Sequence, residues 1–241
     1  MNQADPRLPL YQRLRDEIAQ QIALNVWRPG DSIPTEAELA SEHGIAVGTV
    51  RKALDLLVAD GLVERRQGRG TFVRRPKFDD SLFRFFRHQS PDGKKIIPKG
   101  RILTRESVPA TPSVRDALDL NSNERVIHLS RLRLISEKPV LREEIWLPEQ
   151  RFKPILDVDM SEIGDLLYPA YERLCNEIVA RADETVTVSV AGEDDVRLLA
   201  LSPGEPVVVI DRLALGYDNK PVEWRHTRGS AAEFRYQVEI R

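Results

Sequence analysis

The sequence predicts two domains, a small helical one that ends in a β-hairpin and a larger α+β one built on an antiparallel sheet. Its 241 residues suit two cores better than one. Helical patterns fill the first 61 residues, whereas short segments rich in branched residues predominate from residue 100 onward. Between them, the charged stretch 74–80 contains a proline and lacks periodicity. We therefore expect a first domain over 1–75, a linker over 76–84 and a second domain over 85–241.

Composition excludes several classes of protein. Hydrophobic residues make up 41% and charged residues 31%, a globular mix, and no apolar run approaches the roughly 18 residues that span a bilayer. The N-terminus lacks a basic segment followed by an apolar one, so we expect a cytoplasmic protein without membrane contact. The single cysteine, Cys175, excludes an internal disulfide and a multi-thiolate zinc site, and no metal or cofactor is expected.

Three helices and a hairpin are predicted in the first domain. Tyr11, Leu14, Ile18 and Ile22 recur at helical spacing and predict a helix over 10–25. Residues 35–38 have the Thr-x-x-Glu spacing of a capping box, which starts a second helix that ends at residue 44. A third apolar repeat runs from residue 50 to 61. Strands are expected over 62–64 and 71–73 with a turn at 67–70, which together make a winged helix-turn-helix.

The third helix and the wing carry the side chains expected to contact DNA. The net charge of −2 argues against binding by bulk charge, but residues 65–75 contain five arginines and no acid. The exposed start of the second helix of such a motif enters the major groove, and a glycine-flanked wing can approach the backbone or the minor groove. The residues predicted to bind DNA are Thr35, Gly48, Thr49, Arg51, Lys52, Arg65, Gln67, Gly68 and Arg69.

Residues 10–73 resemble the GntR family of bacterial regulators. The resemblance is carried by PLYQRLRDEIAQQI, RPGDSIPTEAELA and GTVRKALDLLVADGLVERRQGRGTFV. It implies DNA contacts at Thr49, Arg51, Gln67 and Gly68. Many members have a hydroxyl residue and an arginine where this chain has Ala46 and Val47, and an arginine at the position of Ala37, so the operator sequence does not follow from the resemblance.

In the second domain, branched segments predict strands and apolar repeats at helical spacing predict helices. The strands are expected over 100–108, 125–135, 140–147, 185–191, 207–215 and 222–227, and the helices near 113–120, 163–178 and 193–199. Because strands predominate and short turns can connect most of them, the class is α+β with an antiparallel sheet.

Strand 125–135 places two arginines on an apolar face. Alternation puts Arg131 and Arg133 on the same side as apolar neighbours, and the next strand places Glu143 inward as well. Burying two cations without compensation is costly, so they either pair with protein carboxylates or bind an anion. The pattern leaves both a structural ion pair and a ligand cavity open.

Residues 81–241 resemble the UTRA effector domain of the HutC-type subfamily, which has a chorismate lyase-like fold. The resemblance is carried by SLFRFFRHQSPDG, SRLRLISEKPVLREEIWLP and GEPVVVIDRLALGYDNKPVEWRHTRG. It implies effector contacts at Phe85, Phe86, Arg131, Arg133, Glu143, Arg181 and Glu223.

These features indicate a transcriptional regulator, with double-stranded operator DNA as one partner. We expect a homodimeric repressor whose operator affinity is controlled by a small anionic effector, a carboxylate or a phosphate suited to paired guanidinium groups. Two alternatives remain, an architectural DNA-binding dimer without effector and a lyase-like enzyme. Beyond Glu143 and Glu223, no positioned nucleophile, acid or base supports the enzyme, so no enzymatic activity is expected.

Overall fold

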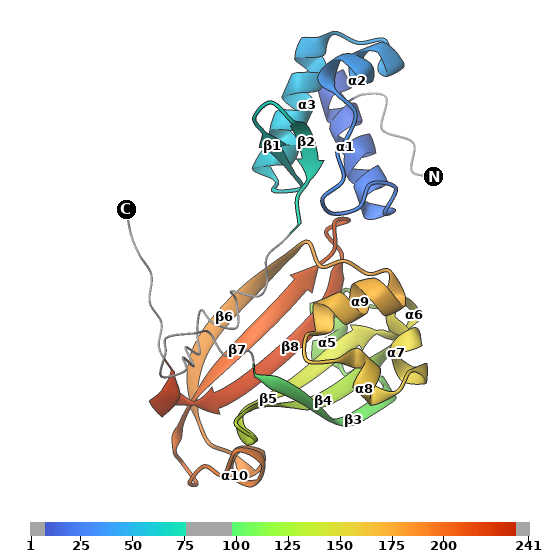
Figure 1. The fold of residues 1–241 in the computed structure, drawn as a ribbon. Helices are drawn as coiled ribbons and strands as arrows, with labels where there is room; N and C mark the ends of the chain where they lie inside the picture. Colours follow the sequence, from blue (N-terminus) through green and yellow to red (C-terminus); the bar gives the residue numbers. More distant parts are fainter. Residues whose placement is uncertain (1–7, 76–97, 235–241) are drawn as a thin grey trace. The chain divides into compact units, whose positions relative to one another are not determined.

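The computed structural model describes residues 8–75 and 98–234. The chain divides into two compact units, residues 1–76 with 216–219 and residues 77–215 with 220–241, and each is described by itself. Phe85, Phe86 and the linker expected over 76–84 lie outside the described residues. Figure 1 shows the helices and strands of both units.

The N-terminal unit consists of three helices and one hairpin. The helices are α1 (Leu10–Ala23), α2 (Glu36–His43) and α3 (Val47–Ala59), and the hairpin is β1 (Val63–Arg66) and β2 (Gly70–Val73). The apolar stripes of α1 and α3 pack together and account for much of the core, which includes Leu14, Ile18, Ile22, Val50, Ala53, Leu54 and Leu57. The expected order of three helices followed by a wing is confirmed.

The C-terminal unit is built on a six-stranded antiparallel sheet. The strands are β3 (Lys99–Pro109), β4 (Arg125–Ile135), β5 (Lys138–Pro148), β6 (Arg181–Val190), β7 (Pro206–Leu215) and β8 (Pro221–Ser230). They lie in the order β3-β4-β5-β8-β7-β6, so β3 and β6 form the two ends of the sheet. Each observed strand contains or overlaps a predicted one, and the α+β class is confirmed.

Helices cover the two faces of this sheet differently. The face we call inner packs against four short helices, as Figure 1 shows: α6 (Glu149–Phe152), α7 (Pro154–Asp157), α8 (Met160–Ile163) and α9 (Leu167–Cys175). The outer face contacts α5 (Pro112–Leu118) through Trp146 and Trp224, and α10 (Glu193–Leu199) through Leu132 and Leu134. A one-turn 3-10 helix, Ala231–Glu233, follows β8.

One predicted helix is wrong in extent. The apolar repeat over 163–178 predicts a single helix, but the structure has α8 before Gly164 and α9 only from Leu167. Gly164 has a φ of 72° and a ψ of −172°, an extended conformation with positive φ that favours glycine and ends the helix. The interruption places the backbone carbonyl of Asp165 against the arginines of β4. None of the described helices is both long and apolar enough to cross a membrane.

Candidate DNA-binding surface and effector site

The predicted DNA-contacting residues of α3 lie at its exposed start. Gly48, Arg51 and Lys52 are exposed and Thr49 is half-buried, because the buried stripe of α3 faces α1. Ala46, the residue before the helix, supplies no side-chain cap for its first N–H groups. The start of α3 therefore presents backbone and side-chain donors to solvent, the polarity that phosphate oxygens and base edges require.

An acidic residue holds two of the predicted DNA-binding arginines. Arg51 donates from Nε and Nη2 to Glu36 Oε2 at 3.1 and 2.9 Å, and Arg65 Nη2 lies 3.3 Å from Glu36 Oε1. Arg65 also pairs with Asp55 at 2.9 Å. Both arginines remain substantially exposed, with 59% and 43% of their side chains accessible. Glu36 therefore occupies donor atoms of both arginines that DNA would otherwise be free to contact.

The wing forms as the glycine pattern predicts. Gly68 and Gly70 have φ values of 69° and 108°, which only glycine adopts readily, and the Arg69 N–H donates to the Arg66 carbonyl to close the turn. Gln67, Gly68 and Arg69 are all exposed at the tip. The guanidiniums of Arg66 and Arg69 lie over the Phe72 ring, at 4.4 and 6.0 Å from its centroid.

Two further predicted contacts already have intramolecular partners. Thr35 is the N-cap of α2: its Oγ1 accepts from the Glu38 N–H at 3.2 Å and donates to Glu38 Oε2 at 2.8 Å. Lys52 Nζ lies 3.9 Å from the centroid of the Tyr11 ring. Both remain exposed, so a contact with DNA is sterically open to each.

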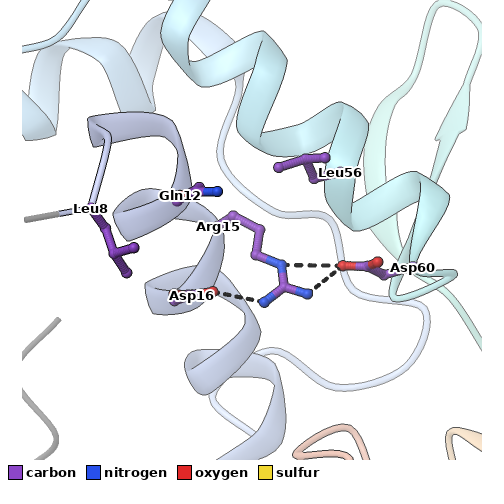
Figure 2. A pocket seen from close by; sticks show the side chains of 6 residues that line it. All are labelled: Leu8, Gln12, Arg15, Asp16, Leu56 and Asp60. Carbon is purple, nitrogen blue, oxygen red and sulfur yellow. Dashed lines mark hydrogen bonds and ion pairs between the residues drawn. The ribbon is translucent and has the colours of Figure 1, made fainter. Parts of the chain in front are cut away.

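A hollow of about 350 Å³ lies between α1 and the last turns of α3 (Figure 2). Arg15 crosses it, donating to Asp60 Oδ2 at 2.5 and 3.1 Å and to Asp16 Oδ1 at 2.7 Å. Leu8, Gln12 and Leu56 complete its lining. Arg15 thus resembles Arg51 in being an arginine paired on the surface, but it contacts the opposite end of α3.

The inner face of the C-terminal sheet holds a cluster of buried ionised side chains, which we call the buried charge cluster. Its members are Arg131, Arg133, Glu143, Arg212, Glu223 and Arg225, each at most 7% exposed. They come from β4, β5, β7 and β8, and they meet because β5 pairs with β8 and β8 with β7.

Glu143 is the centre of this cluster. It lies directly opposite Arg131 in the β4–β5 register and accepts from Arg131 Nε at 2.7 Å and Nη2 at 2.6 Å. Its other oxygen is 3.3 Å from Arg225 Nη1. Burial by itself would raise the pKa of Glu143, but the charges of Arg131, Arg225 and Arg133 outweigh it and lower the pKa to about 2. Glu143 is therefore ionised at neutral pH.

Glu223 is held by a cation and two phenols. Arg225 Nη2 donates to its Oε2 at 2.7 Å, and the hydroxyls of Tyr171 and Tyr168 donate to Oε2 and Oε1 at 2.6 and 3.2 Å. Burial, followed by the charge of Glu223, raises the pKa of Tyr171 well above its usual value, so this phenol remains a donor. Arg212 pairs with Glu184 through Nε at 2.6 Å and donates to the Tyr168 hydroxyl at 3.2 Å.

Arg133 has two buried donor atoms without a hydrogen-bond partner among the described residues, whereas Arg225 has one, its Nε. Arg133 Nη1 donates to the Asp165 carbonyl, and the two unpartnered atoms are Nε and Nη2. These two atoms form one edge of the guanidinium. In Arg131 the corresponding edge donates to the carboxylate of Glu143. Burial, helped by Arg131 and Arg225, lowers the pKa of Arg133 to about 10 against the opposing charge of Glu143. Arg133 remains a cation at neutral pH.

The structure brings together most of the effector residues that the sequence predicts. Arg131, Arg133, Glu143 and Glu223 lie in the cluster, whereas Arg181 lies apart from it. Arg181 is half exposed, pairs with Asp183 at 2.9 Å and sits opposite Leu215 on β7, while Glu184 is the β6 residue that reaches Arg212. Strand alternation thus sends Arg181 to the face away from the cluster.

Two members of the cluster, Arg212 and Arg225, were not among the predicted residues. Three residues that hydrogen-bond to the cluster were also not predicted: Tyr168, Tyr171 and Glu184. Strand alternation, which predicted the arginines of β4, could also have predicted Arg225, since it places Arg225 on the same face as Glu223 two residues before it. The tyrosines, three residues apart on α9, carried no local signal of their partner on β8. Within the described ranges, no group of His, Cys, Asp and Glu is placed to hold a metal ion.

A winged helix-turn-helix with an exposed basic helix defines the class of the chain as a DNA-binding regulatory protein. Residues 10–73 match the model of bacterial regulatory proteins of the gntR family, and residues 94–235 match the UTRA domain. The chain belongs to the GntR family and carries the UTRA domain of its HutC-type members. It is a transcriptional regulator and not an enzyme, because that is what the family and its relatives are. Its two domains are of the types that bind DNA and small-molecule effectors.

Relatives and solved structures agree with this assignment. The mannosyl-D-glycerate transport/metabolism system repressor of Escherichia coli K12 is 28% identical over 95% of both chains. The histidine utilization repressor of Pseudomonas aeruginosa is 30% identical over 85% of this chain and 80% of its own length. The crystal structure of PhnF from Mycobacterium smegmatis matches with a TM-score of 0.55 at 23% identity, covering 97% of this chain and 99% of that one, and so supports the fold.

Proposed function

We propose that this protein is a cytoplasmic, homodimeric repressor whose operator affinity is controlled by a small anionic metabolite bound at the buried charge cluster. The observation that carries the proposal is the unpartnered edge of Arg133. A buried N–H without an acceptor costs free energy, and two on one guanidinium edge match the two oxygens of a carboxylate or phosphate.

The contacts of Arg133 favour an anion over a neutral or cationic effector. The other three arginines of the cluster, Arg131, Arg225 and Arg212, each donate to a carboxylate, that of Glu143, Glu223 and Glu184 respectively. The charge of Asp165 also acts on Arg133, but this carboxylate accepts from the Gly100 N–H, and among the described residues Arg133 donates only to the Asp165 carbonyl. An anionic group on the remaining edge of Arg133 would form a charge-assisted pair where the surrounding dielectric makes the interaction strong.

The ligand-free contacts suggest how the site is occupied. The Asp165 carbonyl, in the break between α8 and α9, already accepts from Arg133 and lies 3.5 Å from Arg131 Nη1. An effector oxygen on the remaining edge of Arg133 would add to this contact or replace it. Because Arg133 is fully buried, entry of an effector requires some of the groups that cover it to move.

The names of the relatives support repression and an acidic effector. Both relatives are called repressors, and one is named for a system of mannosyl-D-glycerate, whose glycerate part is a carboxylate.

Dimers of winged helix-turn-helix proteins bind paired half-sites, and an effector can weaken binding only by favouring a different arrangement of the two heads.

Thermal-shift screening of the full-length protein tests the proposal. We expect carboxylates or phosphates to raise the melting temperature of the wild type, while amide or neutral analogues of the same compounds do not. The compounds that bind should also reduce operator affinity. Arg133→Ala is the matched control and should lose the shift. A response to neutral analogues that equals the response to acids, and that persists in Arg133→Ala, contradicts an anion site at this arginine.

A further inference from the structure

Arg225 bridges the two carboxylates of the buried charge cluster. Its Nη2 donates to Glu223 Oε2 at 2.7 Å, and its Nη1 donates to Glu143 Oε1 at 3.3 Å. Glu143 lies on β5 and Glu223 on β8, and each of the three side chains is at most 4% exposed. Because alternation puts Arg225 on the same face as Glu223, its guanidinium fills the space in which the two carboxylates meet.

This bridge carries a fixed positive charge. Burial by itself would lower the pKa of Arg225, but the charges of Glu223 and Glu143 outweigh it and raise the pKa well above its usual value. The guanidinium carbon also lies 5.6 Å from the centroid of the Tyr168 ring. Arg225 is therefore ionised at neutral pH and is held between two anionic groups.

The two carboxylates depend on this arginine unequally. Glu143 also accepts two bonds from Arg131, so it keeps a cation without Arg225. Among the described residues, Arg225 is the only cation that donates a hydrogen bond to Glu223, whose other donors are the hydroxyls of two tyrosines of α9. Removal of the Arg225 side chain would therefore leave a buried carboxylate with room for a cation beside it.

Arg225 occupies the position where the cluster could bind a cationic group of a ligand. Carboxylates are the groups with which proteins pair an ammonium or guanidinium group, and here a side chain of the protein already makes both pairs. A ligand cation beside Glu223 would face Arg225 at close range, where the low dielectric makes like charges repel strongly. Arg133, in contrast, has an edge without a hydrogen-bond partner among the described residues. The cluster therefore has a position open to an anion, while the position for a cation is filled.

We infer that Arg225 is a specificity-determining residue, which makes the cluster select an acid over the matching amino acid or amine. This inference rests on the proposed effector site and adds the chemical group that the site rejects. The ammonium group of an amino acid would have to displace Arg225 from Glu223 or remain in the cluster without an anionic partner. A hydroxyl group in the same place carries no charge, so it avoids this cost.

Replacement of Arg225 tests the assignment with a probe that mimics the lost side chain. The full-length Arg225→Ala protein should melt at a lower temperature than the wild type, because Glu223 loses its cation. Millimolar methylguanidinium should raise the melting temperature of this variant by about 2–4 °C, while methylurea, its neutral isostere, should not. The wild type should respond to neither compound.

The double variant Arg225→Ala/Glu223→Gln is the matched control. It has the same space beside residue 223 but no carboxylate there, so methylguanidinium should leave its melting temperature unchanged. Equal responses of Arg225→Ala to methylguanidinium and methylurea, including no response to either, would overturn the assignment. A methylguanidinium response that persists in the double variant would also overturn it.

Matched ligands provide a second readout that does not depend on a variant folding. Lactate and alanine, malate and aspartate, and 3-phosphoglycerate and phosphoserine are pairs in which a hydroxyl is replaced by an ammonium group. By titration calorimetry, we expect the wild type to bind the hydroxy acid of a pair about tenfold more tightly or better, and Arg225→Ala to reduce or reverse this preference. Equal affinities of the wild type within the pairs overturn the role of Arg225. If no carboxylate or phosphate binds the wild type, the proposed anion site itself fails, and the methylguanidinium responses distinguish this failure from that of Arg225.

Discussion

Arg51 in the N-terminal unit exposes 59% of its side chain, whereas Arg133 in the C-terminal unit is fully buried. Arg51 has a carboxylate on its guanidinium edge, that of Glu36, which occupies the donor atoms Nε and Nη2. On the corresponding edge, Arg133 has no hydrogen-bond partner among the described residues. Surface arginines therefore gain little from any one ion pair and exchange partners readily, while a buried arginine with an empty edge gains strongly from the right anion.

The largest effect is expected from Glu143→Ala, which tests whether the buried charges depend on one another. The variant leaves Arg131 without its carboxylate and Arg225 with one fewer, so we expect a loss of about 3–5 kcal/mol in the free energy of unfolding. Urea denaturation measures it. Glu137→Ala, which breaks an exposed pair with Lys99, is the control and should leave the urea midpoint nearly unchanged. Similar urea midpoints for the two variants would contradict the expectation that the buried ion pairs contribute more to stability than the exposed pair.

Lowering the pH should reduce the contribution of Glu143 to the free energy of unfolding over a defined pH range. The pKa of Glu143 is lowered from 4.5 to about 2 in the folded protein, so its ionised form stabilises the fold above pH 4.5 and this contribution is lost as the pH falls toward 2. The shift corresponds to roughly 3 kcal/mol. The difference in unfolding free energy between the wild type and Glu143→Gln should be constant from pH 7 to 5 and shrink below pH 4.5. A difference that grows on acidification contradicts this sign.

Arg133→Ala should separate ligand binding from stability. We expect effector affinity to fall by about tenfold or more, since a charge-assisted hydrogen bond is worth about 1.5–3 kcal/mol. The melting temperature should stay constant or rise, because the variant removes a buried cation with two unpartnered N–H groups. Arg131→Ala is the comparison and should lower the melting temperature, since it breaks the pair with Glu143. Equal destabilisation by both variants would make Arg133 a structural residue.

In the N-terminal unit, Arg51→Ala should weaken operator binding by roughly 5- to 150-fold at matched salt if Arg51 contacts a base. Fluorescence anisotropy with labelled operator DNA measures this. Arg15→Ala is the matched control, an arginine paired in the same way in the hollow of Figure 2 but at the far end of α3. An operator affinity equally insensitive to both substitutions would remove Arg51 from the DNA contacts.

The smallest effect is expected from Glu36→Gln. This substitution frees Arg51 and Arg65 from a competing carboxylate and removes a negative charge near the DNA-binding surface. We expect operator affinity to rise by roughly two- to fivefold at low salt and to approach the wild-type value as salt screens the surface. An affinity that falls would mean that Glu36 positions Arg51 for its DNA contact instead of competing for it.

Local periodicity predicted which side chains share a face, and in this it succeeded. Alternation along β4 and β5 placed Arg131, Arg133 and Glu143 together, and the structure finds them adjacent. The same rule excludes Arg181, whose parity sends it to the other face. The capping box at Thr35 and the glycines of the wing were equally local signals, and both formed as predicted.

Local sequence patterns did not predict contacts between segments that are distant in the chain. Arg225 lies against Glu143 only because β8 pairs with β5, across 82 residues of sequence. Tyr171 donates to Glu223 from α9. The apolar repeat predicts too early a start for this helix, because Gly164 interrupts the repeat and α9 begins only at Leu167. The sequence left open whether the arginines form an ion pair or bind an anion. The structure shows the ion pair for Arg131, while Arg133 has an edge without a hydrogen-bond partner among the described residues, so the anion site remains a proposal.

The indole rings of Trp146 and Trp224 stack on the outer face with centroids 4.8 Å apart and planes 28° from parallel. They sit on β5 and β8, the strands that carry Glu143 and Glu223 on the opposite face, and Trp224 lies between Glu223 and Arg225 in the chain. Two aromatic chromophores this close couple their electronic transitions, and the coupling depends steeply on their separation and angle. If the cluster binds the proposed effector, any accompanying change in the spacing of β5 and β8 should alter the far-ultraviolet circular dichroism and the tryptophan emission. The two indoles would then report on the proposed effector site without a label.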